Sequence, residues 1–526
     1  MAYAITQTCC TDATCVSVCP VNCIHPTPGE PGFGTTELLH IDPVACIDCG
    51  ACADACPVEA IFPVDRLAGS LAGYGEVNRR YYEENPTDHA WGEPRFPRSL
   101  PAGTGPLRVA VVGTGPAAAY TAQELLRTAG AEVVMIDRLP VAGGLLRHGV
   151  APDHQSTKRI GDSFAQLHLN PRLRLHLNVE VGRDLTHREL AEHHHAVVYA
   201  TGAAGERELG VPGEELPGVL GAGRVVGWYN ADPTVAADAV QLAGAERAVV
   251  IGNGNVALDV ARILLADPDQ LAGTDIADHA LAALRGSALR EVVLLARRGP
   301  GEAAYTRSEF LALRQLPGIT VVVAEGEGPS EGPKADVLDG LPVERIDWHR
   351  PPPPGRRLVL AFHRQAAAFT GTDRVAGLRL ADGAELPAGL VVRAAGFRGG
   401  PVPGLPFDPA SGRVPHQGGR VEPGTYLAGW IKRGPTGGIG SNRACAEETV
   451  AALLADAAAG LLATPLAPPA EFDRLVRRRC PQATGVRELR AIEKAERARG
   501  AATGRPRVKL ATVAELLAVG RRRGTL

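Results

Sequence analysis

The sequence lacks the features of an exported or membrane-spanning chain. None of its apolar runs approaches the roughly 20 residues that a helix needs to cross a bilayer. The N-terminus has no basic segment followed by an apolar core, which an export signal requires. We therefore expect no membrane insertion and a reducing, cytoplasmic location. In that compartment, clustered cysteines indicate metal binding rather than disulfide bonds.

Basic side chains are missing from the first 65 residues, which contain eight Asp and Glu residues. The whole chain of 526 residues has a formal net charge of −3, so the part beyond residue 65 carries about +5. We expect the acidic N-terminal segment to face a basic body. With 45% hydrophobic and 21% charged residues, a chain of this length is expected to form two to four globular domains.

Cysteine is scarce after residue 56, where only Cys445 and Cys480 occur, whereas nine cysteines precede that point. A pattern C-x2-C-x2-C-x3-C-P is formed by Cys46, Cys49, Cys52 and Cys56. This spacing is typical of bacterial ferredoxins, in which three of the thiolates bind one iron-sulfur cluster and the fourth binds another. A four-cysteine zinc site is the alternative, but the second consecutive C-x2-C step and the C-P ending argue against it.

The first cysteine stretch supplies a matching C-x3-C-P ending at Cys15 and Cys19, without a compact C-x2-C-x2-C run. The segment resembles the seven-iron ferredoxins. That resemblance implies a [4Fe-4S] cluster bound by Cys19, Cys46, Cys49 and Cys52, and a [3Fe-4S] cluster bound by Cys9, Cys15 and Cys56. A second [4Fe-4S] cluster is the alternative at the latter site. Cys23 is interpreted as a buried neighbour.

The third ligand of the first site is open between two adjacent residues. Only five residues separate Cys9 from Cys15, two fewer than is usual in those ferredoxins, and Cys10 stands beside Cys9. Adjacent side chains of an extended segment point to opposite faces, so one backbone path presents one thiolate to a cluster. We favour Cys9.

Two glycine-rich turns follow apolar segments, and each precedes a predicted helix. The first is G-x-G-x-x-A at Gly113, Gly115 and Ala118, with Asp137 ending the next predicted strand. The second repeats this spacing at Gly252, Gly254 and Ala257. Such turns let a pyrophosphate approach the backbone at a helix N-terminus. A tight turn in any α/β protein is the alternative, but the surrounding pattern favours two dinucleotide sites.

The strand predicted after the second turn ends in Arg297 and Arg298, where an NAD-specific site commonly has an acid. Two guanidinium groups at this point indicate recognition of a 2′-phosphate and therefore NADP. A solvated basic turn is the alternative.

Four motifs occur in order: GVAPDH at 149–154, IGNGNVALDVAR at 251–262, ARRGP at 296–300 and GWIKRGPTGGIGSN at 429–442. With them the chain resembles the adrenodoxin-reductase-like ferredoxin-NADP(+) reductases that carry a ferredoxin at the N-terminus. The resemblance implies an α/β fold with two Rossmann-like domains, in which an inserted NADP domain interrupts the FAD domain. A small α+β iron-sulfur domain precedes them.

The domain boundaries expected from this resemblance begin with the ferredoxin domain at 1–65 and a surface linker at 66–105. The FAD domain is expected at 106–208 and 385–465, the NADP domain at 209–384, and a tail at 466–526. The stretch LVVRAAGFRG at 390–399 is expected to resume the first domain. The tail has helical patterns but no chemistry that we can assign.

The same resemblance implies the cofactor contacts. FAD is expected to contact Gly113, Gly115, Pro116, Ala117, Asp137, Gly144, Leu145, Val181, Trp430, Gly437, Gly438 and Ile439. NADP is expected to contact Asn253, Gly254, Asn255, Val256, Arg297, Arg298, Glu309 and Gly437. For Glu309 the alternative is an ordinary exposed helical acid, and for Trp430 it is a core position.

His154 is predicted as a catalytic residue near the flavin ring, where it could orient or shuttle a proton. A structural histidine is the alternative. Many relatives have an acid three residues after the position of Glu309, but this chain has Ala312 there. A proton relay between His154 and an acid at that position would therefore lack its carboxylate.

These features predict hydride transfer between NADPH and FAD, followed by single-electron transfer through the clusters to an external ferredoxin or another one-electron acceptor. An electron-input subunit resembling the small subunit of glutamate synthase is the runner-up. An iron-sulfur binding or sensing module is the alternative from another class, but no nucleic-acid recognition motif supports it. A thioredoxin-reductase-like enzyme is disfavoured because the reductase body has no C-x-x-C.

Overall fold

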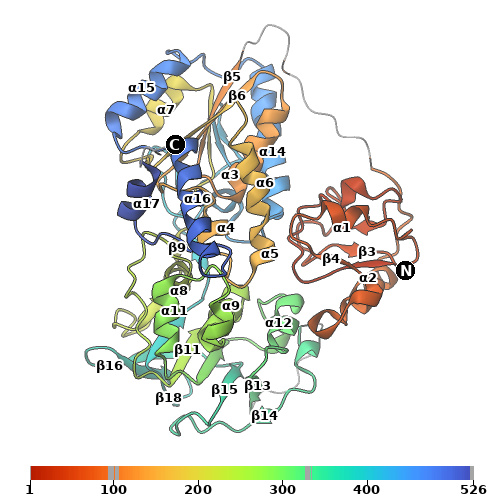
Figure 1. Ribbon diagram of the computed structural model, residues 1–526, viewed down its shortest axis with the longest axis vertical. Helices are drawn as coiled ribbons and strands as arrows, with labels where there is room; N and C mark the ends of the chain where they lie inside the picture. The colour runs from red at the N-terminus through yellow and green to blue at the C-terminus, as the bar shows by residue number, and fades with distance from the viewer. Residues whose placement is uncertain (1, 93–99, 101–105, 326–331, 333, 522–526) are drawn as a thin grey trace.

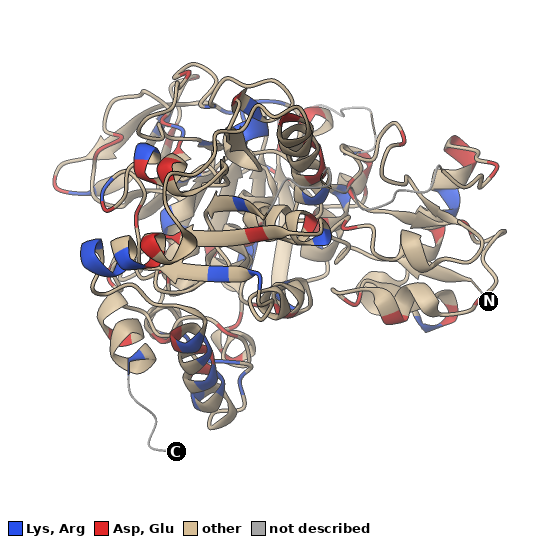
Figure 2. Ribbon diagram, turned by 90° about the horizontal axis from the view of Figure 1, so that it is seen from above, with Lys and Arg blue, Asp and Glu red and all other residues tan. Residues whose placement is uncertain are grey.

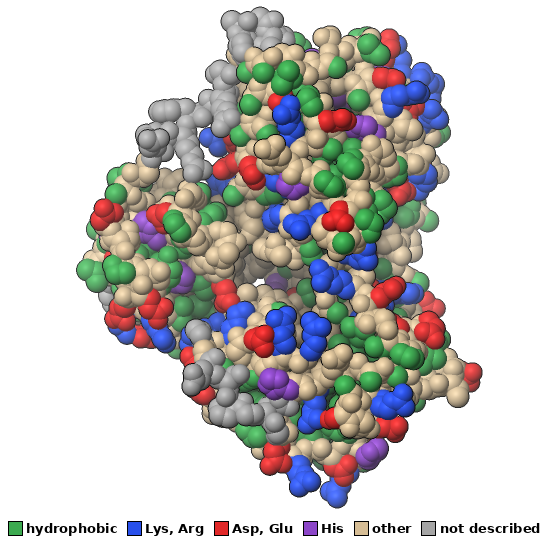
Figure 3. All heavy atoms as spheres, turned by 180° about the vertical axis from the view of Figure 1, so that it is seen from behind, with side chains coloured by type: hydrophobic (Ala, Val, Ile, Leu, Met, Phe, Trp, Pro, Cys, Tyr) green, Lys and Arg blue, Asp and Glu red, His purple; other side chains and the backbone are tan. Residues whose placement is uncertain are grey.

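A computed structural model describes residues 2–92, 100, 106–325, 332 and 334–521 of the chain. The N-terminal lobe lies beside two larger lobes that are stacked along the long axis of the molecule (Figure 1). Seen from behind, the surface is hollowed where the three lobes meet (Figure 3). Within the described residues, no helix is long and apolar enough to cross a membrane.

The N-terminal lobe is built on two short antiparallel pairs. Strand β1 (Tyr3–Ile5) pairs with β4 (Ile61–Pro63), and β2 (Ile24–His25) pairs with β3 (His40–Ile41). The 3-10 turn η1 (Val16–Val18) packs on helix α1 (Ala51–Ala55). Cysteines and branched apolar side chains share the core of this lobe.

Part of the segment expected to be a linker forms helix α2 (Tyr74–Glu84), which packs on β1 and β3, after the short turns η2 (Val64–Arg66) and η3 (Gly69–Leu71). Its buried Asn78 accepts hydrogen bonds from the amides of Ile5 (3.0 Å) and Ile41 (2.8 Å). Asn78 thus joins the helix to both strands, and the Tyr82 hydroxyl adds a hydrogen bond to the His40 carbonyl of β3. The sequence has no apolar periodicity here that would predict the helix.

The first large lobe contains a six-stranded sheet in the order β21-β22-β8-β5-β6-β7. Its strands are β5 (Leu107–Val112), β6 (Ala131–Asp137), β7 (Leu173–Leu177), β8 (Ala196–Tyr199), β21 (Arg420–Glu422) and β22 (Thr425–Leu427). All neighbours are parallel except β21 and β22. Its helices include α3 (Pro116–Arg127), α4 (Leu145–His148), α5 (Gln155–Lys158), α6 (Ile160–Leu167), α7 (His187–His193), α13 (Trp430–Arg433) and α14 (Ser441–Ala458). The sheet therefore combines chain from before residue 200 with chain from after residue 419.

The second large lobe contains a parallel seven-stranded sheet in the order β10-β19-β11-β12-β15-β13-β14. Its strands are β10 (Val219–Gly221), β11 (Arg247–Ile251), β12 (Glu291–Leu295), β13 (Ile319–Ala324), β14 (Val343–Glu344), β15 (Arg356–Ala361) and β19 (Leu390–Arg393). Strands β16 (Ala366–Gly371), β17 (Val375–Leu380) and β18 (Glu385–Pro387) form an antiparallel sheet beside it. The other elements are α8 (Ala222–Tyr229), α9 (Asn255–Leu265), α10 (Pro268–Leu271), α11 (Asp278–Arg285), α12 (Arg307–Leu313), η4 (Pro300–Glu302) and η5 (Asp336–Leu338).

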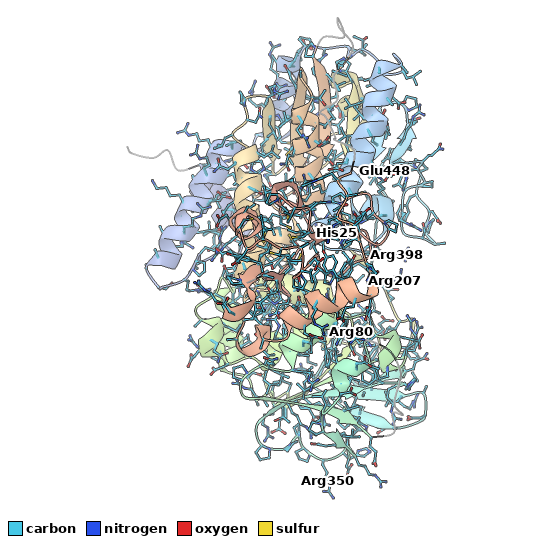
Figure 4. The ribbon with its side chains drawn as sticks, turned by 90° about the vertical axis from the view of Figure 1, so that its right-hand side faces the viewer. His25, Arg80, Arg207, Arg350, Arg398 and Glu448 are labelled. Carbon is cyan, nitrogen blue, oxygen red and sulfur yellow. The ribbon has the colours of Figure 1, made fainter. Side chains whose placement is uncertain are left out.

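One expectation is corrected by strand β19. Residues 390–393 do not resume the first sheet, because β19 lies between β10 and β11 and pairs in parallel with both. The chain crosses back only afterwards, where β20 (Phe397–Arg398) pairs with β9 (Gly205–Glu206). An apolar strand fits either sheet equally well, so its residues alone cannot assign it. Arg207 follows β9, and Arg398 lies in β20. Figure 4 labels both residues between the two larger lobes.

The tail adds three helices to the first sheet and reaches the second lobe. Helix α15 (Pro469–Arg479) packs on one face of the sheet, and α16 (Val486–Ala501) and α17 (Val513–Gly520) pack on the other. The buried Lys509 ammonium lies 2.9 Å from the Asp275 carboxylate and donates to the side-chain oxygen of Asn230 at 3.0 Å. The tail thus ties both large lobes together.

Candidate functional site

The two glycine turns occupy equivalent positions in the two large sheets. Gly113 follows β5 with φ +114°, and a Cβ there would lie 2.5 Å from the Ala200 carbonyl oxygen. Gly252 follows β11 with φ +129°, and a Cβ there would overlap the Ala394 carbonyl oxygen. Each turn therefore requires glycine, since a side chain would strike the neighbouring strand. Each leads into a helix N-terminus, α3 and α9 respectively, which is a site suited to phosphate.

A third glycine completes the cradle of the first turn. Gly144 precedes α4 with φ +51°, and a Cβ there would lie 2.9 Å from the Gly115 Cα. The structure therefore brings the turn after β5 against the start of α4. Pro116 and Ala117 open α3, and Leu145 opens α4 with half of its side chain exposed. Val181 lies in the loop after β7, where it pairs with Leu185.

Asp137 ends β6 beside this cradle. Its carboxylate accepts hydrogen bonds from the Thr114 hydroxyl at 2.6 Å and from the Leu139 amide at 3.0 Å. Burial raises the pKa of Asp137, and these two hydrogen bonds lower it. The carboxylate is therefore held in place at the edge of the sheet, at the position where an adenosine ribose is recognised in this type of turn.

The return segment meets the first turn. Gly429 has φ +75°, and a Cβ there would lie 2.5 Å from the Ala117 Cβ. Trp430 begins α13, donates from its indole to the Thr436 carbonyl at 3.2 Å and stacks on Phe397. The predicted contacts Gly437, Gly438 and Ile439 lie just before α14, and Asn442 donates to the carbonyls of Gly438 and Ile439. Residues from both ends of the interrupted lobe are thus adjacent.

The second turn is tied to helix α12. The Asn255 amide oxygen accepts from the Thr306 backbone amide at 2.8 Å, and Asn253 accepts from the Ala304 amide at 3.3 Å. Thr306 caps α12, and Gly254 and Val256 flank the start of α9. Arg297 and Arg298 are exposed at the carboxyl end of β12, the strand next to β11, and Arg298 pairs with Glu302 at 3.4 Å. The arrangement leaves both guanidinium groups on the same edge as the turn.

His154, Asp259 and Glu309 form a cluster at the junction of the lobes. One side-chain donor atom from each lies within 4.8 Å of the others. His154 comes from the start of α5, Asp259 from α9 and Glu309 from α12. Burial raises the pKa of Asp259, His154 lowers it and Glu309 raises it further. A histidine and two acids at this distance can hold or pass a proton.

Arg262 supplies the positive charge beside this cluster. Its guanidinium donates to Asp259 at 2.5 Å and pairs with Asp153. Three such donors also suit a divalent cation, but a fixed guanidinium already balances the acids. Asp259 was not predicted from the sequence, and it places a carboxylate near His154, which Ala312 cannot do. An acid within the apolar run VALDVA of a predicted buried helix was the available signal.

Five cysteines of the N-terminal lobe line one pocket. Cys19, Cys46, Cys49 and Cys52 face it together with Tyr3, Ile41 and Ile47. Cys23 also lines the pocket, with its sulfur 3.5 Å from that of Cys19. Soft thiolates converging on an apolar pocket fit an iron-sulfur cluster. The ligand set predicted for the [4Fe-4S] cluster is therefore brought together.

Cys9, Cys15 and Cys56 gather at a second place in the lobe. The pKa of the Cys15 thiol is raised mainly by burial. The nearby side chains of Cys9, Asp12 and Cys56 raise it further. The Cys9 sulfur accepts from the Thr11 amide at 3.4 Å, and the Cys56 sulfur accepts from the Ala60 amide at 3.3 Å. Burial raises the pKa of the Cys9 and Cys56 thiols, and these amides act in the opposite direction by favouring the thiolate. The sulfurs of Cys9, Cys15 and Cys56 therefore also fit an iron-sulfur cluster.

Cys10 differs from Cys9 in its surroundings. It is buried at the border with the first large lobe, where its carbonyl accepts from the Gly440 amide at 2.8 Å. The pKa of Tyr120 on α3 is raised mainly by burial and by the charge of Asp12. The nearby Cys10 thiol raises it further. Cys10 therefore faces the reductase body, which supports Cys9 as the ligand.

Comparison with protein families and known proteins agrees with this architecture. A family described as pyridine nucleotide-disulphide oxidoreductase matches residues 107–298, and a 4Fe-4S binding domain matches residues 39–62. The two therefore match separate parts of the chain.

Named relatives cover either the whole chain or its reductase part. A probable ferredoxin/ferredoxin–NADP reductase of Mycobacterium tuberculosis is 47% identical over 98% of this chain and 95% of its own length. The NADPH-ferredoxin reductase FprA of the same organism is 44% identical over 79% of this chain and 99% of its own. The solved structure of FprA in complex with NADPH has a TM-score of 0.74 at 42% identity and covers 79% of this chain and 99% of that one. This chain belongs to the family of ferredoxin–NADP reductases of the adrenodoxin-reductase type with a ferredoxin domain at the N-terminus.

Proposed function

We propose that the chain transfers electrons between NADP(H) and a one-electron acceptor, through FAD and two iron-sulfur clusters. The observation that carries this proposal is one hydrogen bond. The Gly440 amide, which follows the glycine-rich turn 437–439, donates to the Cys10 carbonyl at 2.8 Å. Gly440 follows Ile439, which we assign to the flavin, and Cys10 follows Cys9, which we assign to a cluster, so the two proposed sites adjoin.

FAD fits the first large lobe. The glycine cradle of Gly113, Gly115 and Gly144 leaves its backbone open at the N-terminus of α3, which would hold the pyrophosphate. Asp137 would accept hydrogen bonds from the ribose. We assign the remaining contacts to Pro116, Ala117, Leu145, Val181, Trp430, Gly437, Gly438 and Ile439.

NADP(H) fits the second large lobe. The N-terminus of α9, with Asn253, Gly254, Asn255 and Val256, would hold its pyrophosphate. Arg297 and Arg298 would bind the 2′-phosphate, and their exposure leaves both free of the burial cost that a deep pocket imposes. Glu309 and Gly437 would line the path towards the first lobe. We retain the sequence-based domain boundaries as part of this proposal, with the N-terminal domain extended to include α2 and the end of the second lobe moved to about residue 393.

The clusters fit the two cysteine sites. We assign Cys19, Cys46, Cys49 and Cys52 to a [4Fe-4S] cluster, and Cys9, Cys15 and Cys56 to a [3Fe-4S] cluster. When bound, the flavin and the clusters supply the conversion of a two-electron donor into single-electron steps. The chain contributes orientation, exclusion of water and hydrogen bonds to the sulfurs.

His154 would hold a proton at the junction of the lobes. Asp259 and Glu309 each have a carboxylate oxygen within 4.8 Å of a nitrogen of its ring, and Arg262 keeps Asp259 in position. We therefore assign catalytic proton handling to His154 and positioning to Asp259.

Steady-state turnover with ferricyanide tests the proposed function. We expect the purified chain to reduce two ferricyanide ions per NADPH consumed, because each ion accepts one electron and a hydride carries two. NADH should be a much poorer donor. Absence of NADPH-dependent turnover in protein that contains flavin would overturn the proposal.

A further inference from the structure

The N-terminal lobe contacts the body of the protein through the surroundings of the three-cysteine site. Cys10 accepts from Gly440, and the Asp12 carbonyl accepts from the Arg443 guanidinium at 2.8 Å. Glu59, three residues after Cys56, pairs with Arg159. The loops on both sides of this site therefore face the first large lobe.

The second large lobe contacts the same side of the N-terminal lobe. The Glu37 carboxylate accepts from the Arg307 amide at 2.7 Å, at the start of α12. Burial is the main cause that raises the pKa of the Tyr74 phenol on α2. Glu309 and Glu37 lie close enough to raise it further. The lobe thus sits at the junction where the two nucleotide sites meet.

The four-cysteine site faces the opposite way. Cys49 is exposed, and so are Val44 (92%) and Ile47 (58%) earlier in the same loop and Val18 (39%) of η1, the turn that packs on α1. Asp48 and Asp54 are exposed on the same loop and on α1. We call this set, Val18, Val44, Ile47, Asp48, Cys49 and Asp54, the exit surface. Because Cys49 is a proposed cluster ligand and is exposed on this surface, a protein docked there would lie close to the cluster.

The eight acids of the first 65 residues divide by location. Asp12, Glu37 and Glu59 lie where the lobe meets the body. Glu30 and Asp42 bond to His25 and His89 within the lobe. Asp48, Asp54 and Asp65 are exposed. Figure 2 shows this lobe with red positions and little blue, in contrast to the C-terminal helices. Three of the eight acids therefore lie on the side that faces the body, and two, Asp48 and Asp54, are exposed on the exit surface.

We propose that electrons leave the chain at the exit surface, and that the acceptor is a one-electron carrier protein with basic side chains around an apolar contact. The proposal rests on the proposed function and specifies its partner. One NADPH is oxidised to NADP+ and a proton, and its two electrons reduce two acceptor molecules by one electron each. The three-cysteine site lies on the entry side, next to Gly440, and the four-cysteine site lies on the exit side.

Charge decides between two kinds of carrier. Opposite charges steer a basic partner to an acidic surface, whereas like charges facing each other cost several kcal/mol. A separate acidic ferredoxin would therefore be repelled. The exposed apolar residues at the centre would give such a complex its desolvated contact.

Binding of oxidised cytochrome c, a basic one-electron carrier, to the oxidised protein with both clusters and flavin tests the proposal. The double variant Val44→Lys, Asp54→Asn should raise the Kd by at least about tenfold at low salt, because its charge change of +2 cancels the negative charge of Asp48 and Asp54 on the exit surface. Isothermal titration calorimetry measures this without turnover. Wild-type affinity should fall steeply with added salt.

The matched control is Val343→Lys, Asp373→Asn, which makes the same charge change in the second large lobe. Val343 is 66% exposed on β14, at the end of that lobe in Figure 1. Its Kd should stay within about twofold of wild type. Equal loss in both variants, no measurable wild-type binding, or tighter binding of an acidic plant-type ferredoxin would each overturn the proposal.

A paramagnetic probe tests the orientation of the two sites. An aqueous gadolinium chelate should enhance the electron-spin relaxation of the reduced [4Fe-4S] signal strongly and that of the oxidised [3Fe-4S] signal weakly. The reverse order would contradict the orientation. NADPH reduction of flavin in the same samples separates the two failures: if reduction is normal, only the exit surface is wrong, and if wild type fails to reduce, the proposed function is wrong.

Discussion

The Gly440 amide donates to the Cys10 carbonyl at 2.8 Å, and a Cβ on Gly440 would overlap the backbone of Cys10 and Thr11. The two residues are 430 positions apart in the chain, and they join the ferredoxin domain to the turn that precedes α14. The Arg443 guanidinium reinforces the contact from one turn further along that helix. Close backbone approach at this point therefore controls how the N-terminal lobe is seated.

The first prediction follows from this contact. Gly440→Ala should displace the N-terminal lobe while FAD stays bound, because the added methyl group overlaps the backbone of residues 10 and 11. We expect flavin reduction by NADPH at the wild-type rate and cluster reduction at least about tenfold slower in anaerobic stopped-flow spectra. Gly34→Ala is the control, since a Cβ there meets nothing within 4 Å. Unchanged cluster reduction in Gly440→Ala would remove this contact from the electron path.

The second prediction concerns the choice of nucleotide. Replacing Arg297 and Arg298 with Ala should weaken NADPH binding at least about 100-fold, because each guanidinium contact to a phosphate contributes about 1.5 to 3 kcal/mol. NADH binding should change little. Arg345→Ala, Arg350→Ala is the control, and Figure 4 shows Arg350 at the far end of the second large lobe. An equal loss for both nucleotides would contradict the assignment.

The third prediction separates Cys9 from Cys10. Cys9→Ser should abolish the EPR signal of the oxidised [3Fe-4S] cluster, and Cys10→Ser should largely preserve it, because Cys10 faces Tyr120 and the body. NADPH reduction of flavin should persist in both. If Cys10→Ser loses the signal instead, Cys10 and not Cys9 is the ligand. If both variants retain the signal, the three-iron site is contradicted.

The fourth prediction concerns pH. His40 is buried, its ring stacks on Tyr81 with centroids 4.0 Å apart, and burial lowers its pKa to about 4. Between pH 6.5 and 4 the unfolded chain binds a proton at this position and the folded chain does not, so stability falls as pH falls. The loss amounts to at most about 3 kcal/mol.

His40→Phe keeps the stacked ring and removes the titration. Its melting temperature, measured by calorimetry, should exceed that of wild type by a margin that grows from pH 7 to pH 5. A constant difference across this range would show that His40 does not couple folding to pH.

Sequence patterns predicted the parts whose residues are close together in the chain. The cysteine spacing indicated the iron-sulfur sites, and the repeated glycine turns indicated the two nucleotide lobes, because a turn and its helix are local structures. Helix α2 was missed since one buried amide, Asn78, fixes it rather than an apolar stripe. Strand β19 was misplaced since its neighbours β10 and β11 are distant in sequence.

Contacts between lobes could not be predicted. Asp259 meets His154 only because α9 and α5 converge, and Ala312 in the sequence suggested that the histidine had no acidic partner. Lys509 meets Asp275 across 234 positions, which no local pattern encodes. These pairings depend on tertiary packing, and they define the junction on which the proposed chemistry depends.

Anaerobic titration of the purified full chain with NADPH, followed by optical and EPR spectra of the same samples, tests the central claim most directly. We predict that NADPH bleaches the flavin and removes the oxidised [3Fe-4S] signal together, and that Gly440→Ala separates the two events in time. Flavin that bleaches fully while excess NADPH leaves that signal unchanged, in protein whose cluster dithionite reduces, would contradict the account.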